Sequence, residues 1–190
     1  GVKDAAGNEK TQTYDSLNRV LEVKGPNTGR MWFKYDNLGR PIRRGDARDA
    51  VLATSYDPMG RKTMEFDVAD EEGTKRRWYY DVPQDGCLQN GTDRCTYPAG
   101  KAVKMTFASP SCPNDGVCEE WNGYSSRGEV TYRGRTLPDS NGYLFTFSST
   151  YDNAGRLTRS LYPDGRAMDF SYDGSGRFVA IHHGNDTLVE

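Results

Sequence analysis

Long hydrophobic runs are missing from this sequence of 190 residues. No stretch approaches the roughly 18 consecutive apolar residues of a membrane-spanning helix, so no transmembrane segment is expected. No segment keeps the helical period of about 3.6 residues over some ten positions without an interrupting glycine or proline. These absences argue against a helical fold and against a transmembrane helix.

Aliphatic residues are also scarce. Hydrophobic residues make up 35% of the chain, and Leu, Ile, Val and Phe together are fewer than one residue in five. Such a composition is typical of disordered chains when the net charge is large. Here the net charge is only −2 and aromatic residues reach 12%. Because aromatic rings bury a large area per residue, we expect one folded domain with a thin, aromatic core.

Neither sign of charge dominates, and recognisable reaction centres are absent. The near balance predicts no nucleic-acid partner. No G-x-S-x-G, H-E-x-x-H or P-loop motif occurs. The adjacent His182 and His183 would face opposite sides of a strand. Asp67, Asp70 and Glu71–Glu72 favour a solvated turn, with a calcium site as the alternative. No catalytic residue, metal ligand or cofactor is predicted, and an enzyme is not expected.

What the sequence does contain is a repeat. The pattern Tyr-Asp-x-x-Gly-Arg recurs, and a further copy at Tyr14–Arg19 has Asn18 in the glycine position. Tyr14, Tyr35 and Tyr56 are 21 residues apart, as are Tyr151 and Tyr172. A fixed period of this length is the signature of a repeat architecture. The residues assigned structural roles in these turns are Tyr14, Asp15, Tyr35, Asp36, Gly39, Arg40, Tyr56, Asp57, Gly60, Arg61, Tyr151, Asp152, Gly155, Arg156, Tyr172, Asp173, Gly176 and Arg177.

The motif has the chemistry of a turn between two strands. Tyrosine favours strands, and aspartate at the first turn position with glycine at the fourth suits a type I turn. Glycine with positive φ continues such a turn into a bulged hairpin, and asparagine is the best substitute there. Each tyrosine is therefore predicted to close one strand and each arginine to open the next. The aspartate is expected to cap the turn, and the arginine to pair with a carboxylate or stack on tyrosine.

A second turn lies midway between copies, at Tyr162–Arg166 and at Gly25–Arg30. Apolar residues alternate with polar ones before the motif, as in Met31, Phe33 and Tyr35. That period of two indicates half-buried strands. The sequence predicts an all-β, antiparallel up-and-down meander of hairpins.

These motifs resemble the YD repeats of Rhs and teneurin-type proteins and of the shell-forming components of insecticidal toxin complexes. The resemblance implies a curved, spiralling sheet that forms a hollow shell, which encloses a toxin in some members and belongs to an adhesion ectodomain in teneurins. Toxin shells end in an Asp-Pro-x-Gly-Leu motif, whereas Asp57–Gly60 is followed by Arg61. We therefore interpret the chain as part of a shell wall.

The repeats divide the sequence into three parts. Residues 1–66 hold three copies and residues 143–190 hold two. Residues 67–142 match only through degenerate copies at Tyr79–Asp81 and Tyr124–Gly128, and they carry a cysteine-containing insertion.

All four cysteines lie in that middle part. We expect local disulfides, Cys87–Cys95 and Cys112–Cys118, because each pair flanks a short loop rich in Gly, Asn and Asp. The other pairings and a zinc site remain alternatives, although the spacings are not those of a zinc knuckle. Disulfides predict a secreted, extracellular or cell-surface protein.

The middle part also concentrates aromatic residues. Trp78, Tyr79, Trp121 and Tyr124 either pad a small satellite core or form an exposed platform that binds a carbohydrate or a protein.

The sequence is compatible with three functions. The chain is expected to be a non-enzymatic scaffold in a secreted or cell-surface shell that encloses or displays a toxin or partner. The alternatives are a self-assembling, filament-forming β-repeat protein and an adhesion or glycan-binding module. Asn8–Tyr14 and Phe178–His182 read as unprotected edge strands, which we expect to be occupied by further YD repeats of a longer parent chain or by neighbouring copies.

Overall fold

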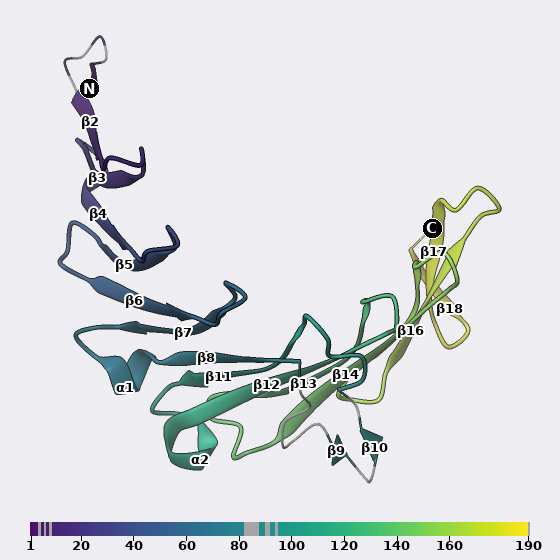
Figure 1. Cartoon of the computed structure of the whole chain (residues 1–190). Coiled ribbons are helices and arrows are strands. Elements are labelled where there is room, and N and C mark those ends of the chain that lie inside the picture. Colours follow the sequence, from purple (N-terminus) through teal and green to yellow (C-terminus); the bar gives the residue numbers. More distant parts are fainter. Residues whose placement is uncertain are drawn as a thin grey trace. The chain divides into compact units, whose positions relative to one another are not determined.

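The computed structural model describes residues 1–3, 5, 7, 9–81, 88–89, 92–93 and 95–189. As predicted, the chain is all-β: sixteen of the described strands form one open antiparallel sheet (Figure 1). Each strand of this sheet lies beside its neighbour in the sequence, which is an up-and-down meander. By its contacts the chain divides into two compact units, Gly1–Arg77 and Trp78–Glu190.

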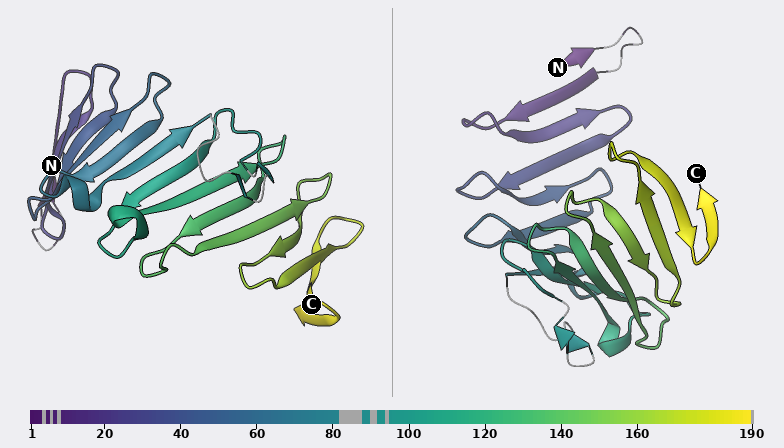
Figure 2. Two further views of the ribbon diagram at one scale, coloured as in Figure 1. Left: turned by 90° about the horizontal axis from the view of Figure 1, so that it is seen from below. Right: turned by 90° about the vertical axis from the view of Figure 1, so that its right-hand side faces the viewer.

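The first unit is a run of hairpins with one short helix (Figure 2). Its elements are β1 (Val2–Lys3), β2 (Glu9–Tyr14), β3 (Val20–Gly25), β4 (Gly29–Tyr35), β5 (Pro41–Gly45), β6 (Val51–Tyr56), β7 (Lys62–Asp67) and α1 (Glu71–Thr74). Strand β8 (Arg76–Tyr80) begins in this unit and ends in the second.

The second unit continues the same pattern after an interruption. Its main sheet elements are β11 (Ala102–Ala108), β12 (Val117–Tyr124), β13 (Val130–Thr136), β14 (Leu144–Tyr151), β15 (Leu157–Leu161), β16 (Ala167–Tyr172), β17 (Phe178–His183) and β18 (Asp186–Val189). The short helix α2 (Pro113–Gly116) precedes β12, and β9 (Leu88–Gln89) pairs with β10 (Thr92–Asp93) in a separate small sheet.

Every full Tyr-Asp copy forms the predicted turn, with one adjustment. β4 ends at Tyr35, but β5 begins at Pro41, one residue after the arginine. Arg40 stays in the turn because its carbonyl accepts the Asp36 N–H (3.0 Å) while its side chain folds back on the same aspartate. The pairing register shifts between Lys34 and Tyr35, which fits the bulged hairpin expected from the motif.

The backbone at the glycine position is left-handed. φ is +79° at Gly39, +82° at Gly60, +79° at Gly155 and +82° at Gly176, and Asn18 takes +61°. These positive φ values confirm the predicted turn conformation. They also explain the choice of residue, because an L-residue other than Asn or Asp is strained there.

Replacing Gly155 with alanine is expected to lower the free energy of unfolding by about 1 kcal/mol, because a β-carbon is unfavourable at positive φ. Urea denaturation followed by circular dichroism measures the change. Gly174→Ala is the matched control, since Gly174 lies in the next turn without positive φ and with open space around it. Equal stability of the two variants would remove the turn mechanism.

Most side chains of the sheet are only half-buried, and the buried core is small. In the second unit Cys95, Trp121 and Tyr132 are at most 5% exposed and pack together with Leu144. In the first unit Ala53 is the only buried hydrophobic residue among those described. Aromatic rings carry much of the packing, as the composition suggested.

Candidate functional site

The aspartate of each repeat organises its own turn. Asp36 Oδ1 accepts the N–H groups of Leu38 and Arg40, both at 2.9 Å. Its Oδ2 accepts Arg40 Nε at 2.7 Å. The same three bonds recur around Asp15, Asp152 and Asp173. The arginine therefore pairs with the carboxylate of its own turn and not with one across the strands.

The arginine then reaches the tyrosine of the next repeat. The guanidinium carbon lies 4.8 Å from the ring centroid in the pair Arg19–Tyr35 and 5.0 Å in the pair Arg40–Tyr56. In the second unit Arg156 lies 4.8 Å from the centre of Tyr172. These distances are typical of cation–π contacts.

The tyrosine returns a bond to the preceding repeat. The hydroxyl of Tyr35 donates to the Val20 carbonyl (2.8 Å), and that of Tyr56 to the Pro41 carbonyl (2.9 Å). Arg40 Nη1 also donates to the Asp57 carbonyl at 2.9 Å. We call this set a repeat contact. In it, the arginine of one repeat lies over the tyrosine ring of the next repeat, and the hydroxyl of that tyrosine donates to the carbonyl of the residue that follows the arginine.

The carboxylates of these turns have lowered pKa values. For Asp36 the backbone N–H of Arg40 is the main cause, with the Arg40 side chain adding to it, and the pKa falls below its ordinary value of 3.8. The pKa values of Asp15, Asp152 and Asp173 are also lowered, in each case mainly by the backbone N–H of the arginine in the same turn.

Acid is therefore expected to weaken the fold. A carboxyl group whose pKa is lower in the folded state stabilises the fold above its unfolded pKa, and that stability is lost as the pH falls through the folded value. The free energy of unfolding should fall below about pH 4. Thermal melting between pH 7 and pH 2.5 measures it, with Asp36→Asn as a less stable variant whose pH dependence is shallower. A flat profile would contradict the role of the carboxylates.

The degenerate copy at Tyr124 keeps the turn with other residues. Ser125 N–H donates to the Glu129 carbonyl (2.8 Å), and Gly128 has φ +92°. The Ser125 hydroxyl bonds Glu129, so these two replace the Asp–Arg pair. Arg127 Nη2 donates to the Asp152 carbonyl of the next repeat (2.6 Å).

The degenerate copy at Tyr79–Asp81 also forms a repeat turn, but the insertion lies inside it, which the sequence analysis did not predict. Asp81 N–H donates to the Lys101 carbonyl (3.2 Å), and Gly100 has φ +73°. Asp81, Gly100 and Lys101 thus hold the Asp, Gly and Arg positions of a turn. The Lys101 ammonium lies 5.7 Å from the centre of the Tyr124 ring, and the Tyr124 hydroxyl donates to the Ala102 carbonyl (2.7 Å). The sequence signal for this turn is Gly100-Lys101, which is followed by a new alternation of apolar and polar residues.

The predicted aromatic platform is occupied by the chain's own lysines. Trp121 is 5% exposed and belongs to the core, so its interpretation as an exposed binding residue is wrong. Lys104 Nζ lies 5.7 Å from the centre of the Trp121 ring and 5.9 Å from that of Tyr79. Tyr124 is taken up by Lys101 as above, and Trp78 is half-buried. This arrangement fits the satellite-core alternative.

One of the two predicted disulfides is confirmed. Cys112 and Cys118 are joined and close the connection between β11 and β12. Cys95 is disulfide-bonded and fully buried. Its predicted partner Cys87 lies outside the described residues.

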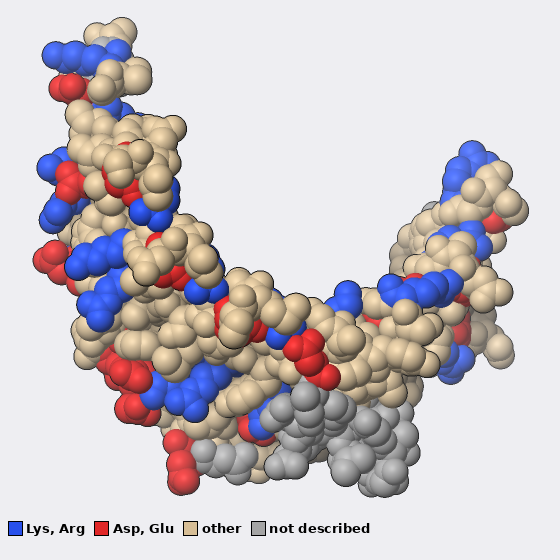
Figure 3. Space-filling model, viewed as in Figure 1, with Lys and Arg blue, Asp and Glu red and all other residues tan. Residues whose placement is uncertain are grey.

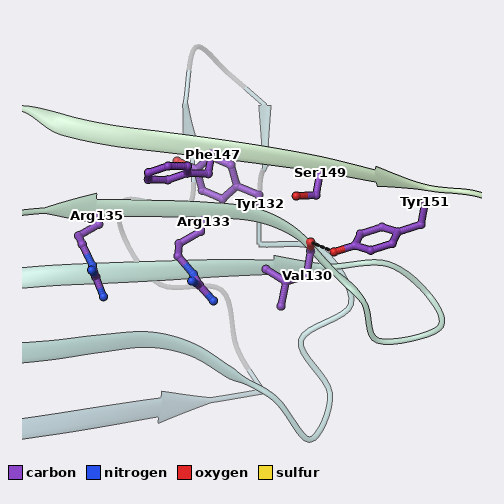
Figure 4. Close-up of a pocket in the computed structure, with 7 residues that line it drawn as sticks. All are labelled: Val130, Tyr132, Arg133, Arg135, Phe147, Ser149 and Tyr151. Atoms are coloured by element: carbon purple, nitrogen blue, oxygen red, sulfur yellow. Dashed lines mark hydrogen bonds between the residues drawn. The ribbon is translucent and has the colours of Figure 1, made fainter. Parts of the chain in front are cut away.

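A hollow of about 330 Å³ lies on the second unit, between β13 and β14 (Figure 4). Phe147, Ser149 and Tyr151 line it from β14, and Tyr151 donates its hydroxyl to the Val130 carbonyl (3.0 Å). Arg133 and Arg135 lie at its other side, and both pair with Glu120. The hollow is therefore an aromatic surface depression whose two arginines share one carboxylate.

The described residues offer little for catalysis or metal binding. Ser171 Oγ is 3.4 Å from His182 Nε2, and His182 Nδ1 is 3.1 Å from Thr187 Oγ1, so no carboxylate orients this histidine. His183 Nδ1 lies 2.9 Å from the Ala167 carbonyl. No group of three potential metal ligands is found in the described part of the chain.

The acidic run near α1 has internal partners. Asp70 caps α1 by accepting the Gly73 N–H (2.9 Å), and Lys75 pairs with Glu71 and Glu72. On the face seen in Figure 3, acidic and basic side chains are interspersed along the strands. No helix in the described residues is long and apolar enough to cross a membrane.

Known proteins resemble this chain in sequence over one segment and in fold over most of its length. The RHS Repeat family model matches residues 139–187. No similar sequence was found among curated proteins. The crystal structure of TcdB2-TccC3 matches with 19% identity and a TM-score of 0.70, and so does the structure of a Photorhabdus luminescens Tc holotoxin pore. Each match covers 95% of this chain, and this chain spans 9% of the matched one.

At this identity the structural likeness establishes the fold. Residues 139–187 match the RHS Repeat family, and the Tyr-Asp turns outside that segment have the same left-handed glycine or asparagine.

Proposed function

We propose that this chain is a non-enzymatic wall segment of an Rhs-like shell that encloses or displays a toxin or another partner. The repeat contact carries the proposal. It gives each repeat the same joint to the next, as at Arg40–Tyr56 and Arg156–Tyr172, so a sheet can extend by addition of like units. The fold likeness to toxin-complex structures supports the same reading.

The chemistry of the described residues suits a wall. Hydrogen bonds between strands and the arginine–tyrosine contacts replace a deep core, so the sheet stays thin. The Cys112–Cys118 disulfide supports placement in an oxidising environment, outside the cell or on its surface. We expect the partners to be further YD repeats and an enclosed polypeptide.

Self-assembly is a second candidate because the sheet has open edges. The two strands predicted at the edges are wrong, because β2 pairs with β1 and β17 pairs with β18. β1 and β18 are the outermost described strands of the sheet, and all their described residues are exposed. Exposed edges invite strand addition by another chain. Adhesion through a glycan-binding aromatic platform has less support, because lysines already face Tyr79, Trp121 and Tyr124.

Negative-stain imaging of the native polypeptide that contains this sequence tests the proposal. Discrete hollow particles are expected, together with an enclosed segment that resists protease until urea opens the wall. Fibres would favour self-assembly. Particles without a lumen, or an enclosed segment cut at the same rate before and after urea, would contradict the shell.

A further inference from the structure

An arginine in the middle of the first unit has no partner for its charge. Arg44 lies in β5 and is exposed. Its side chain makes no ion pair, hydrogen bond or ring contact with the described residues. The residues paired with it across the sheet are both apolar, Phe33 on β4 and Leu52 on β6. Because directly paired residues share one face of a sheet, two apolar side chains flank the Arg44 side chain.

The corresponding arginine of the second unit is bound by the chain itself. Arg133 and Arg44 each lie three residues after the carbonyl that accepts the next tyrosine hydroxyl. Arg133 Nε donates to Asn122 Oδ1 (3.2 Å) and lies 3.8 Å from a carboxylate oxygen of Glu120. Phe33 holds the position of Asn122 beside Arg44, and phenylalanine accepts no hydrogen bond. The charge of Arg44 is therefore unmet within its own repeat.

A hollow of about 480 Å³ lies beside Arg44 on strands β4 to β7. Phe33, Tyr35 and Tyr56 line it with aromatic rings. The two tyrosines are held in place, because their hydroxyls donate to backbone carbonyls at 2.8 and 2.9 Å. Arg43 also lines the hollow, and its side chain has no ion pair with the described residues. The hollow is preformed, positive and of a size typical of ligand sites.

The carboxylates near Arg44 do not offset this positive charge. Glu65 lines the same hollow, but its carboxylate pairs with Lys62 Nζ at 2.7 Å. A second hollow, of about 300 Å³, adjoins Arg44, and there the carboxylate of Asp67 is accompanied by the guanidinium of Arg76. An acidic ligand is therefore needed to complement Arg44.

We propose that Arg44 and the aromatic hollow bind an extended segment of a partner polypeptide that carries an acidic and an aromatic residue two positions apart. Residues with this spacing point to the same side of an extended segment. The carboxylate accepts two parallel hydrogen bonds from the Arg44 guanidinium, and the aromatic ring packs against Phe33, Tyr35 and Tyr56. This inference rests on the proposed function, because its ligand is the polypeptide that the wall encloses or displays.

The composition of the site selects this ligand over others. A planar guanidinium matches a carboxylate in geometry and charge, whereas Arg43 and Arg44 repel a basic segment. The apolar flanks, Phe33 and Leu52, keep water from one part of the ion pair and so strengthen it. An acidic segment without an aromatic residue would leave the rings of the hollow uncovered.

The peptide acetyl-Gly-Phe-Gly-Glu-Gly-amide is the probe, because its caps leave glutamate as its only charge. It is titrated at low salt into the ¹⁵N-labelled 190-residue chain while the backbone amide chemical shifts are recorded by NMR. Saturable shifts are expected at Phe33, Arg44 and Thr54. Arg44→Gln in the chain, or glutamine in place of glutamate in the peptide, should weaken binding about fivefold, the upper range for an exposed ion pair. Alanine in place of the peptide's phenylalanine should also weaken it.

Arg48→Gln is the matched control, since it removes the same charge from a side chain that is 87% exposed and lies outside the hollow. It should leave binding unchanged. Arg44→Gln should fold like the wild-type chain, because it breaks no contact with the described residues, and its amide spectrum checks this.

The inference is overturned if no saturable shifts appear at these positions. It is also overturned if binding survives Arg44→Gln, or the loss of the peptide's carboxylate, without weakening. Hollow native particles without peptide binding would refute only this inference, and peptide binding without hollow particles would refute only the shell.

Discussion

Replacing Trp121 with alanine is expected to lower the free energy of unfolding by about 3–5 kcal/mol, the usual cost of emptying a buried aromatic site. Trp121 is 5% exposed, packs with Cys95 and Tyr132, and lies over the Lys104 ammonium. The described core is small, so little else in the second unit can compensate for the loss of this ring. Urea denaturation followed by far-ultraviolet circular dichroism measures the effect without relying on tryptophan fluorescence.

Phe147→Ala is the control for Trp121→Ala. Phe147 lies beside the hollow between β13 and β14 and is 38% exposed, so its loss should be much less destabilising. If Trp121→Ala were as mild as Phe147→Ala, the ring would not be part of the core, and the platform interpretation would return.

Removing the Cys112–Cys118 disulfide with the double change Cys112→Ala and Cys118→Ala is expected to cost about 2 kcal/mol. The chain-entropy model assigns roughly this value to a loop this short, because the unfolded chain regains the freedom that the bond removed. Alanine is chosen since both residues are buried and serine would place a hydroxyl there. Thermal and urea unfolding of the two proteins give the difference.

Peptide mapping without reductant provides the control for this variant. The wild-type protein should yield one cross-linked fragment containing Cys112 and Cys118. Finding both as free thiols in secreted material would contradict the disulfide and weaken the argument for an oxidising compartment.

The repeat contact explains why the motif needs its residues together. Aspartate fixes the turn and holds the arginine, and the held arginine covers the next tyrosine. In the Tyr124 copy Ser125 and Glu129 replace the Asp–Arg pair, and Arg127 instead reaches the next turn at Asp152. The joint therefore tolerates different residues as long as a turn and a cation toward the next repeat are kept.

The sequence by itself determined the strands and turns, because their causes are local. Asp36, Gly39 and Arg40 interact within five residues of one another, and alternation such as that of Met31, Phe33 and Tyr35 reports burial directly. The positive φ at Gly39 and the pairing of Cys112 with Cys118 also depend only on residues that are close together in the sequence.

Only the tertiary structure decided which residues meet across repeats. The Lys101 carbonyl accepts the Asp81 N–H and closes one turn although the insertion separates the two residues, and Trp121 and Cys95 share one core. The arginine of one turn covers the tyrosine of the next, as Arg40 covers Tyr56. These contacts depend on strand register and on which segment folds over which face, and no local pattern carries that information.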